Sequence, residues 1–128
     1  LVLKSAREMT KGKVIAVLGC GGDRDRTKRP QMGRALTAAD FPIFTSDNPR
    51  SEDPENILNE MCAEIVLDDS KIRITDRREA IATAVTLASP GDCIIVLGKG
   101  HELGQEINGE IKPFDDRVEL AKAIEELA

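Results

Sequence analysis

The distribution of apolar and polar residues along the chain predicts two strands that are buried on both faces. Residues 14–18 and 93–97 are short, uninterrupted apolar runs, and a glycine follows each of them directly. Such runs are typical of central strands in a parallel sheet, because helices cover both sides of it. Residues 41–45 and 72–75 predict two further, shorter strands.

Five segments around these strands have the apolar spacing or the start signals of helices. Asp53, followed by Pro54, and Asp76 are residues that commonly cap a helix N-terminus. Residues 65–67 are compatible either with a short strand or with the end of the preceding helix. The expected helices cover residues 1–10, 31–39, 54–63, 77–88 and about 115–127.

The alternation of strands and helices predicts an α/β fold, with a Rossmann-like, mostly parallel sheet flanked by helices. The pair Asn108-Gly109 lies within an alternating segment and predicts a C-terminal β-hairpin at the edge of the sheet. No linker divides the chain, so residues 1–128 are expected to form one domain. In such sheets, ligands bind outside the carboxyl ends of the strands. Three loops leave strands at that edge: residues 19–30, 46–53 and 98–104.

Composition and charge narrow the function classes. The 128 residues are 41% hydrophobic and 32% charged, which is typical of a globular protein. The formal net charge of −5 argues against nonspecific nucleic-acid binding, which needs an excess of Lys and Arg. No apolar run has the length of a membrane span and no signal peptide is visible, so we expect a cytoplasmic protein. Three widely spaced cysteines and one histidine indicate buried, reduced thiols rather than disulfides or a zinc site.

The loop after the first apolar strand begins with glycines and continues with a dense run of charges. Its segment GCGGDRD, residues 19–25, is not a dinucleotide-binding fingerprint, because Arg24 stands where the third glycine would fall. It is not a P-loop either, since no Gly-Lys-Ser/Thr follows. A tight turn alone explains the glycines, whereas the charges after them suit an anionic or zwitterionic ligand. From these residues alone the two interpretations stay open.

The loop after the second strand contains the tetrapeptide Asp47-Asn48-Pro49-Arg50. Pro49 stiffens the loop and favours an extended Asn48. Arg50 carries a planar guanidinium that suits a carboxylate. The alternative is an ordinary Asn-Pro turn with a solvated arginine.

The sequence GKGHE follows the last apolar strand, and FDDR stands at the start of the last helix. The glycines in GKGHE let backbone amides approach a ligand, and Glu102 is suited to an ammonium group. His101 is more typical of a structural residue than of a catalytic one. The carboxylates of residues 115 and 116 favour a helix N-terminus, so we interpret FDDR as structural.

In this order, the motifs resemble the C-terminal domain of the Mur ligases. The stretches LGCGGDRDRTKRPQMG, TSDNPRSEDP, LGKGHE and FDDR carry the resemblance, which spans essentially the whole chain. The likeness is to the members that attach the third peptide residue to UDP-N-acetylmuramoyl-L-alanyl-D-glutamate in peptidoglycan synthesis. An unaltered D-N-P-R implies meso-diaminopimelate as the amino acid, because the lysine-adding members depart from that tetrapeptide.

The resemblance implies one part of a larger ATP-dependent ligase. In that family a central domain uses ATP and Mg²⁺ to phosphorylate a carboxylate, and the amine of the incoming amino acid attacks the acyl phosphate. The missing initiator Met and the absence of a P-loop lead us to expect a fragment without the UDP-binding and ATPase domains, inactive by itself. We expect it to be a monomer with no catalytic residue, metal, nucleic-acid partner or membrane partner of its own.

By the same resemblance, the diaminopimelate site draws on all three loops. Arg24 is expected to bind one carboxylate, and Asn48 and Arg50 the distal end of the amino acid. Gly98, through its backbone, and Glu102 are expected to supply the remaining contacts. The whole implied substrate-binding set is Arg24, Asp47, Asn48, Pro49, Arg50, Gly98 and Glu102. Three more charged residues either face the nucleotide or organise Arg24: Asp23, Lys28 and Arg29.

The sequence leaves two alternatives to a diaminopimelate-adding ligase. One is a sister ligase that adds L-lysine, against which the tetrapeptide D-N-P-R argues. The other is a free-standing α/β module that binds a small anion, against which the four motifs in register argue. An amino-acid exchange assay on the full-length protein separates the first from the diaminopimelate ligase, and an upstream P-loop in the parent gene excludes the second.

Overall fold

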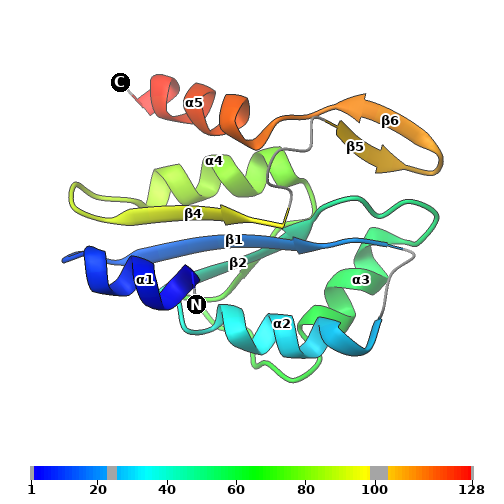
Figure 1. Ribbon diagram of the computed structural model, residues 1–128, viewed down its shortest axis with the longest axis horizontal. Helices are drawn as coiled ribbons and strands as arrows, with labels where there is room; N and C mark the ends of the chain where they lie inside the picture. Colours follow the sequence, from blue (N-terminus) through cyan, green and yellow to red (C-terminus); the bar gives the residue numbers. More distant parts are fainter. Residues whose placement is uncertain (1, 23–25, 99–103, 128) are drawn as a thin grey trace.

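The computed structural model describes residues 2–22, 26–98 and 104–127, and these form an α/β fold, as the sequence predicts. Its main sheet has four parallel strands in the order β3-β2-β1-β4 (Figure 1). The strands are β1 (Val14–Cys20), β2 (Phe41–Ser46), β3 (Ile72–Arg73) and β4 (Cys93–Leu97). The helices are α1 (Val2–Met9), η1 (a 3₁₀ turn, Arg26–Lys28), α2 (Arg29–Leu36), α3 (Pro54–Met61), α4 (Arg77–Leu87) and α5 (Asp116–Leu127).

Helices cover both faces of the sheet, as expected for parallel strands. On one face, apolar side chains of β1 such as Ala16 and Leu18 pack with Leu36 of α2 and with Ile57 and Leu58 of α3. On the other face, α4 packs against the alternate side chains of β1 and β2. Helix α5 then lies against α4 and not against the sheet (Figure 1).

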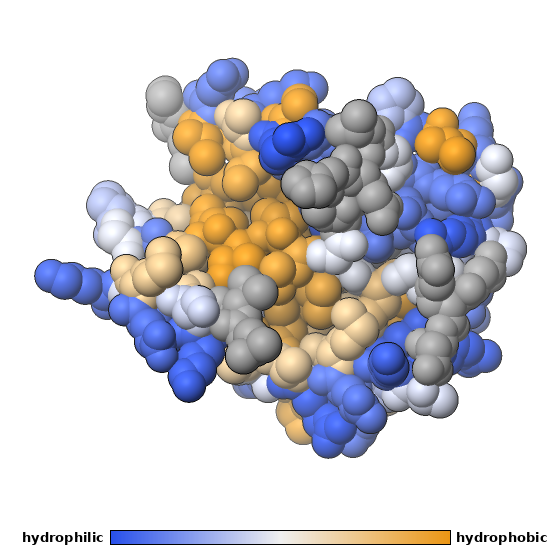
Figure 2. Space-filling view, in the orientation of Figure 1, coloured by the Kyte–Doolittle hydropathy of each residue, from blue (hydrophilic) through white to orange (hydrophobic). Residues whose placement is uncertain are grey.

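The prediction of two fully buried strands is confirmed for β1 and wrong for β4. Every residue of β1 is buried, because β1 lies between β2 and β4. Every residue of β4 is only half-buried, because β4 forms one edge of the sheet. Its side chains Cys93, Ile95 and Leu97 pack at the margin of the core that α1, α2 and α3 cover. Figure 2 shows apolar surface at the centre of this face.

The local signals of helix starts are confirmed. The side chain of Asp53 accepts the backbone N–H of Glu55 at the start of α3, and Asp76 accepts that of Arg78 at the start of α4. Residues 65–67, for which a strand and a helix end stayed open, belong to neither. No helix within the described parts of the chain is long and apolar enough to cross a membrane.

The predicted hairpin forms around Asn108 and Gly109, with strands β5 (Gly104–Ile107) and β6 (Glu110–Pro113). Both turn residues have positive φ, 51° and 78°, as a two-residue hairpin of this type requires. The hairpin is a separate two-stranded sheet, not an added strand of the main sheet. It meets the loop after β2 instead, where Ile107 and Arg50 form an isolated parallel bridge.

Candidate ligand-binding site

Described residues that follow β1 and β2, together with Gly98 directly after β4, lie at the carboxyl edge of the sheet, where the topology predicts a ligand site. A cleft of about 360 Å³ opens there. It is lined by Gly19, Cys20, Gly21, Lys28, Arg29, Met32, Asp47 and Gly98. The structure therefore brings together four of the residues singled out from the sequence: Lys28, Arg29, Asp47 and Gly98.

Gly98 occupies a position that only glycine fits. Its φ is +104°, and a Cβ atom would stand 2.8 Å from the carbonyl oxygen of Gly19. The backbones that leave β4 and β1 therefore approach each other closely at the cleft. A Cβ atom at Gly19 would in turn stand 2.5 Å from the backbone carbonyl carbon of Ser46. Main-chain groups, rather than side chains, therefore form this part of the cleft.

The loop with Asp47-Asn48-Pro49-Arg50 is held by the hairpin. Asn48 is 7% exposed, and its Oδ1 accepts the backbone N–H of Glu106 at 2.9 Å. The N–H of Arg50 donates to the carbonyl of Glu106 at 2.9 Å, and the N–H of Asn108 donates to the carbonyl of Arg50 at 2.7 Å. These bonds hold Arg50 at a φ of +53°, which is uncommon for a residue with a side chain.

The Arg50 side chain reaches back to the loop after β1. Its Nη1 donates to the carbonyl oxygen of Gly22 at 2.8 Å, and its Nε lies 3.9 Å from the Glu106 carboxylate. The N–H of Gly22 in turn donates to the carbonyl of Asn48 at 2.6 Å. The loops after β1 and β2 are thus joined directly, and the Arg50 side chain remains 21% exposed at their junction.

Arg29 is turned into the protein. Its side chain is 2% exposed and forms ion pairs with Glu52 and with Glu60 of α3. Its Nη2 also donates to the carbonyl of Gly21 at 2.9 Å. Hydrogen bonds from Arg26, and then from Arg29, hold the pKa of Glu60 below its ordinary value. Arg29 thus ties the loop after β1 to α3, and its predicted role, facing a nucleotide or organising Arg24, stays a prediction.

Cys20 lines the cleft but has the chemistry of a core residue. It is 5% exposed, and burial raises the pKa of its thiol to about 11. The thiol therefore stays protonated near neutral pH and is a poor nucleophile. Cys62 is also buried, whereas Cys93 is half-buried, so the expectation of buried thiols holds for two of the three cysteines.

Several residues predicted for the site lie outside the described residues, namely Asp23, Arg24 and Glu102, as does His101. The structure also adds residues that the sequence analysis missed. Gln105 donates from Nε2 to the carbonyl of Asp47 at 2.7 Å, beside the backbone bonds of Glu106. The hairpin signal was visible in the sequence, but nothing in it indicated which loop the hairpin would meet.

The sequence of the chain is similar to that of known proteins. The family model "Mur ligase, glutamate ligase domain" matches residues 1–100. A UDP-N-acetylmuramoyl-L-alanyl-D-glutamate–2,6-diaminopimelate ligase from Streptomyces avermitilis is 51% identical over 131 residues, which cover 98% of this chain and 26% of the relative. The ligase of the same name from Listeria innocua is 50% identical over 125 residues, with 97% and 26% covered.

A solved structure of a ligase with that name has a TM-score of 0.92 and 48% identity to this chain, and covers 98% of it. The match takes in 26% of that protein, so the chain spans about a quarter of the length of these relatives. The family model covers most of the chain, and the solved structure has the same fold. The chain therefore belongs to the Mur ligase family.

Proposed function

We propose that this chain is the amino-acid-binding part of an ATP-dependent ligase in peptidoglycan synthesis. The ligase adds meso-diaminopimelate to UDP-N-acetylmuramoyl-L-alanyl-D-glutamate. The relatives named above are ligases for 2,6-diaminopimelate. The observation that carries the proposal is the junction of the three loops, where Arg50, Asp47, Lys28 and Gly98 stand around one edge of the sheet.

The groups at this edge suit a zwitterion with two carboxylates and two ammonium groups. Because Oδ1 of Asn48 accepts a hydrogen bond from the hairpin, its amide nitrogen is the donor end and matches a carboxylate. Arg50 supplies a guanidinium at the same loop, and Lys28 a further positive charge at the cleft. For the ammonium groups we propose Glu102, which lies outside the described residues, together with main-chain carbonyls.

In the proposed reaction, the amine of diaminopimelate attacks the acyl-phosphate carbon of the nucleotide-linked substrate. A C–N bond forms, phosphate leaves with the electron pair of the broken C–O bond, and the nitrogen loses a proton. The contribution of this chain is to hold and orient the amine. Orientation of this kind lowers the barrier by converting a bimolecular step into an effectively unimolecular one.

ATP and Mg²⁺ do not fit this chain as a resident site. The sequence has no G-x-x-x-x-G-K-[S/T] loop to hold nucleotide phosphates. Among the residues that the structure describes, no three His, Cys, Asp or Glu side chains are grouped to hold a metal ion. We propose that both bind to the remainder of the full-length protein, which would work as a monomer in the cytoplasm.

The proposal is tested by ligation assays on the full-length protein and on the 128-residue chain. With UDP-N-acetylmuramoyl-L-alanyl-D-glutamate, ATP and meso-diaminopimelate, the full-length protein should form the tripeptide product. The 128-residue chain should form none, because it lacks a phosphate-binding loop. Product formed by the 128-residue chain alone would contradict the proposal that ATP binds to the remainder of the full-length protein. A full-length enzyme that prefers L-lysine would contradict the proposal that diaminopimelate is the substrate.

A further inference from the structure

Arg77, at the start of α4, is a buried charged residue that does not line the proposed cleft. Its residue exposure is 1%. Its Nε and Nη2 donate to the two carboxylate oxygens of Asp116, at 2.8 and 2.7 Å. Asp116 is the first residue of α5, and its side chain is 9% exposed. A paired, two-bond contact of this kind fixes the plane of the guanidinium.

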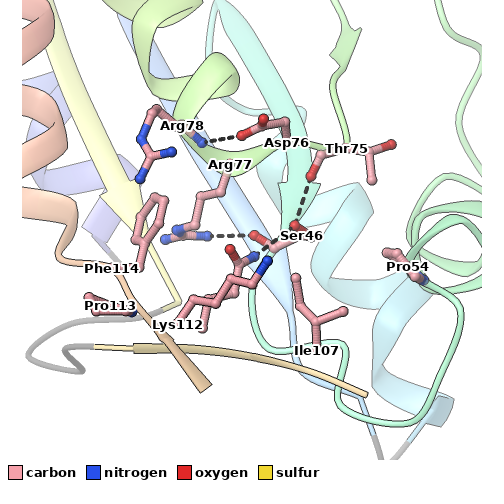
Figure 3. Close-up of a pocket in the computed structure, with 11 residues that line it drawn as sticks. Ser46, Pro54, Thr75, Asp76, Arg77, Arg78, Ile107, Lys112, Pro113 and Phe114 are labelled. Atoms are coloured by element: carbon pink, nitrogen blue, oxygen red, sulfur yellow. Dashed lines mark hydrogen bonds between the residues drawn. The ribbon is translucent and has the colours of Figure 1, made fainter. Parts of the chain in front are cut away.

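Two further donors of Arg77 are directed at the ends of two strands. Nη1 donates to the carbonyl of Ser46 at 3.1 Å, and Nη2 donates to the carbonyl of Leu97 at 3.0 Å. Figure 3 shows the side chain pointing from α4 toward Ser46. Ser46 is the last residue of β2 and precedes Asp47, whereas Leu97 is the last residue of β4 and precedes Gly98.

These two strands are not neighbours. Strand β1 lies between β2 and β4, so their separation is roughly 10 Å, two strand spacings. One rigid guanidinium therefore links two strand ends that the hydrogen bonds of the sheet connect only through β1. The loops that follow these two ends carry Asp47 to Arg50 on one side and Gly98 on the other.

A second contact holds the end of β2 from the side of the hairpin. Nε2 of Gln105 donates to Oγ of Ser46 at 3.1 Å and to the carbonyl of Asp47 at 2.7 Å. The Ser46 hydroxyl also donates to the carbonyl of Thr75 at 2.7 Å (Figure 3). The start of the Asp47 loop is thus fixed from α4 and from β5, while Arg77 alone of these side chains also reaches β4.

We infer that Arg77, held in place by Asp116, is a positioning residue that sets the separation between the Asp47–Arg50 loop and Gly98. It would therefore determine the fit of the amino acid between them without touching it. This inference rests on the proposed function. A lysine at position 77 keeps the charge beside Asp116, but one ammonium cannot form the paired contact and reach both carbonyls.

The test uses the full-length enzyme and three variants: Arg77→Lys, Asp116→Asn and the double variant Arg77→Met/Asp116→Leu. The double variant removes both buried charges, and such apolar replacements often keep a protein folded. We expect the KM for diaminopimelate to rise at least tenfold in Arg77→Lys and in the double variant, and less in Asp116→Asn. The KM for ATP should stay within twofold, and kcat per folded enzyme within about threefold.

Neighbouring residues of the same type provide the controls. Arg78→Lys and Asp115→Asn change residues that pair with Glu119 and Arg117, and they should leave the KM for diaminopimelate unchanged. Thermal unfolding measured on every variant separates the two roles. If the Arg77 variants have lowered melting temperatures but a KM for diaminopimelate within twofold of wild type, Arg77 has only a structural role and the inference is wrong. A wild-type enzyme that does not use diaminopimelate would instead overturn the proposed function.

Discussion

Replacing Arg50 with alanine in the full-length enzyme should lower kcat/KM for meso-diaminopimelate far more than for L-lysine. The two amino acids share one amino-acid end and the side-chain amine, and they differ by the distal carboxylate. Removing one partner of a hydrogen-bonded charge pair in a partly dehydrated cleft typically costs about 2–5 kcal/mol, because the other charge, here the distal carboxylate, is left unpaired. The expected loss with diaminopimelate is thus about 30-fold to several thousand-fold.

The ratio of the two kcat/KM values is the quantity to measure. Arg50 also donates to the carbonyl of Gly22, and losing this hydrogen bond affects both amino acids alike. Such shared effects cancel in the ratio. Arg50→Lys should recover only part of the selectivity, since an ammonium cannot bind a carboxylate through two parallel bonds.

Arg26→Ala is the matched control for Arg50→Ala. It removes one positive charge near the same edge of the sheet, but Arg26 is exposed and pairs with Glu60. Its selectivity ratio should stay at the wild-type value. If Arg50→Ala lowers both kcat/KM values by the same factor, Arg50 does not recognise the distal carboxylate.

Gly22→Ala is expected to reduce kcat/KM for diaminopimelate by about 100-fold, the loss that a misplacement of about 1 Å can cause. A Cβ atom at position 22 would overlap the backbone carbonyl of Pro49, so one of the two loops must move. The movement would also break the short hydrogen bond from the N–H of Gly22 to Asn48. Steady-state kinetics with diaminopimelate and with ATP as the varied substrate measure the effect.

Gly33→Ala supplies the control for Gly22→Ala. A Cβ atom there would overlap the carbonyl of Met61, a comparable clash between α2 and α3 away from the Asp47–Arg50 loop. This variant should lower the melting temperature while leaving the KM for diaminopimelate near the wild-type value. Equal kinetic losses in the two variants would show that general destabilisation, and not loop position, explains Gly22→Ala.

The elements with strong local signals were predictable from the sequence. Asp53 and Asp76 cap helices because a short acidic side chain can accept the free N–H groups of a first helical turn. Asn108-Gly109 forms a hairpin because both residues tolerate positive φ. Parallel strands end at the same edge of a sheet, so the loops that follow them were expected there. The position of the cleft could therefore be predicted from the alternation of strands and helices.

Contacts between distant segments were not predictable in the same way. The burial of β4 depends on its place at the edge of the sheet, and an apolar run gives no information about strand order. The attachment of the hairpin to Arg50 depends on backbone groups that every residue carries. In the FDDR motif, Asp116 does begin a helix, but its two bonds to Arg77 join residues 39 positions apart.

The central claim is that the loops after β1, β2 and β4 together bind diaminopimelate. A titration of the ¹⁵N-labelled 128-residue chain with meso-diaminopimelate, followed by NMR, tests it most directly. We predict that the largest shifts occur at the backbone amides of Gly22, Asn48, Arg50 and Gly98, and that L-lysine produces smaller shifts at Arg50. Shifts concentrated instead around Thr75, Arg78 and Phe114, which line a separate pocket of about 400 Å³, would contradict the account.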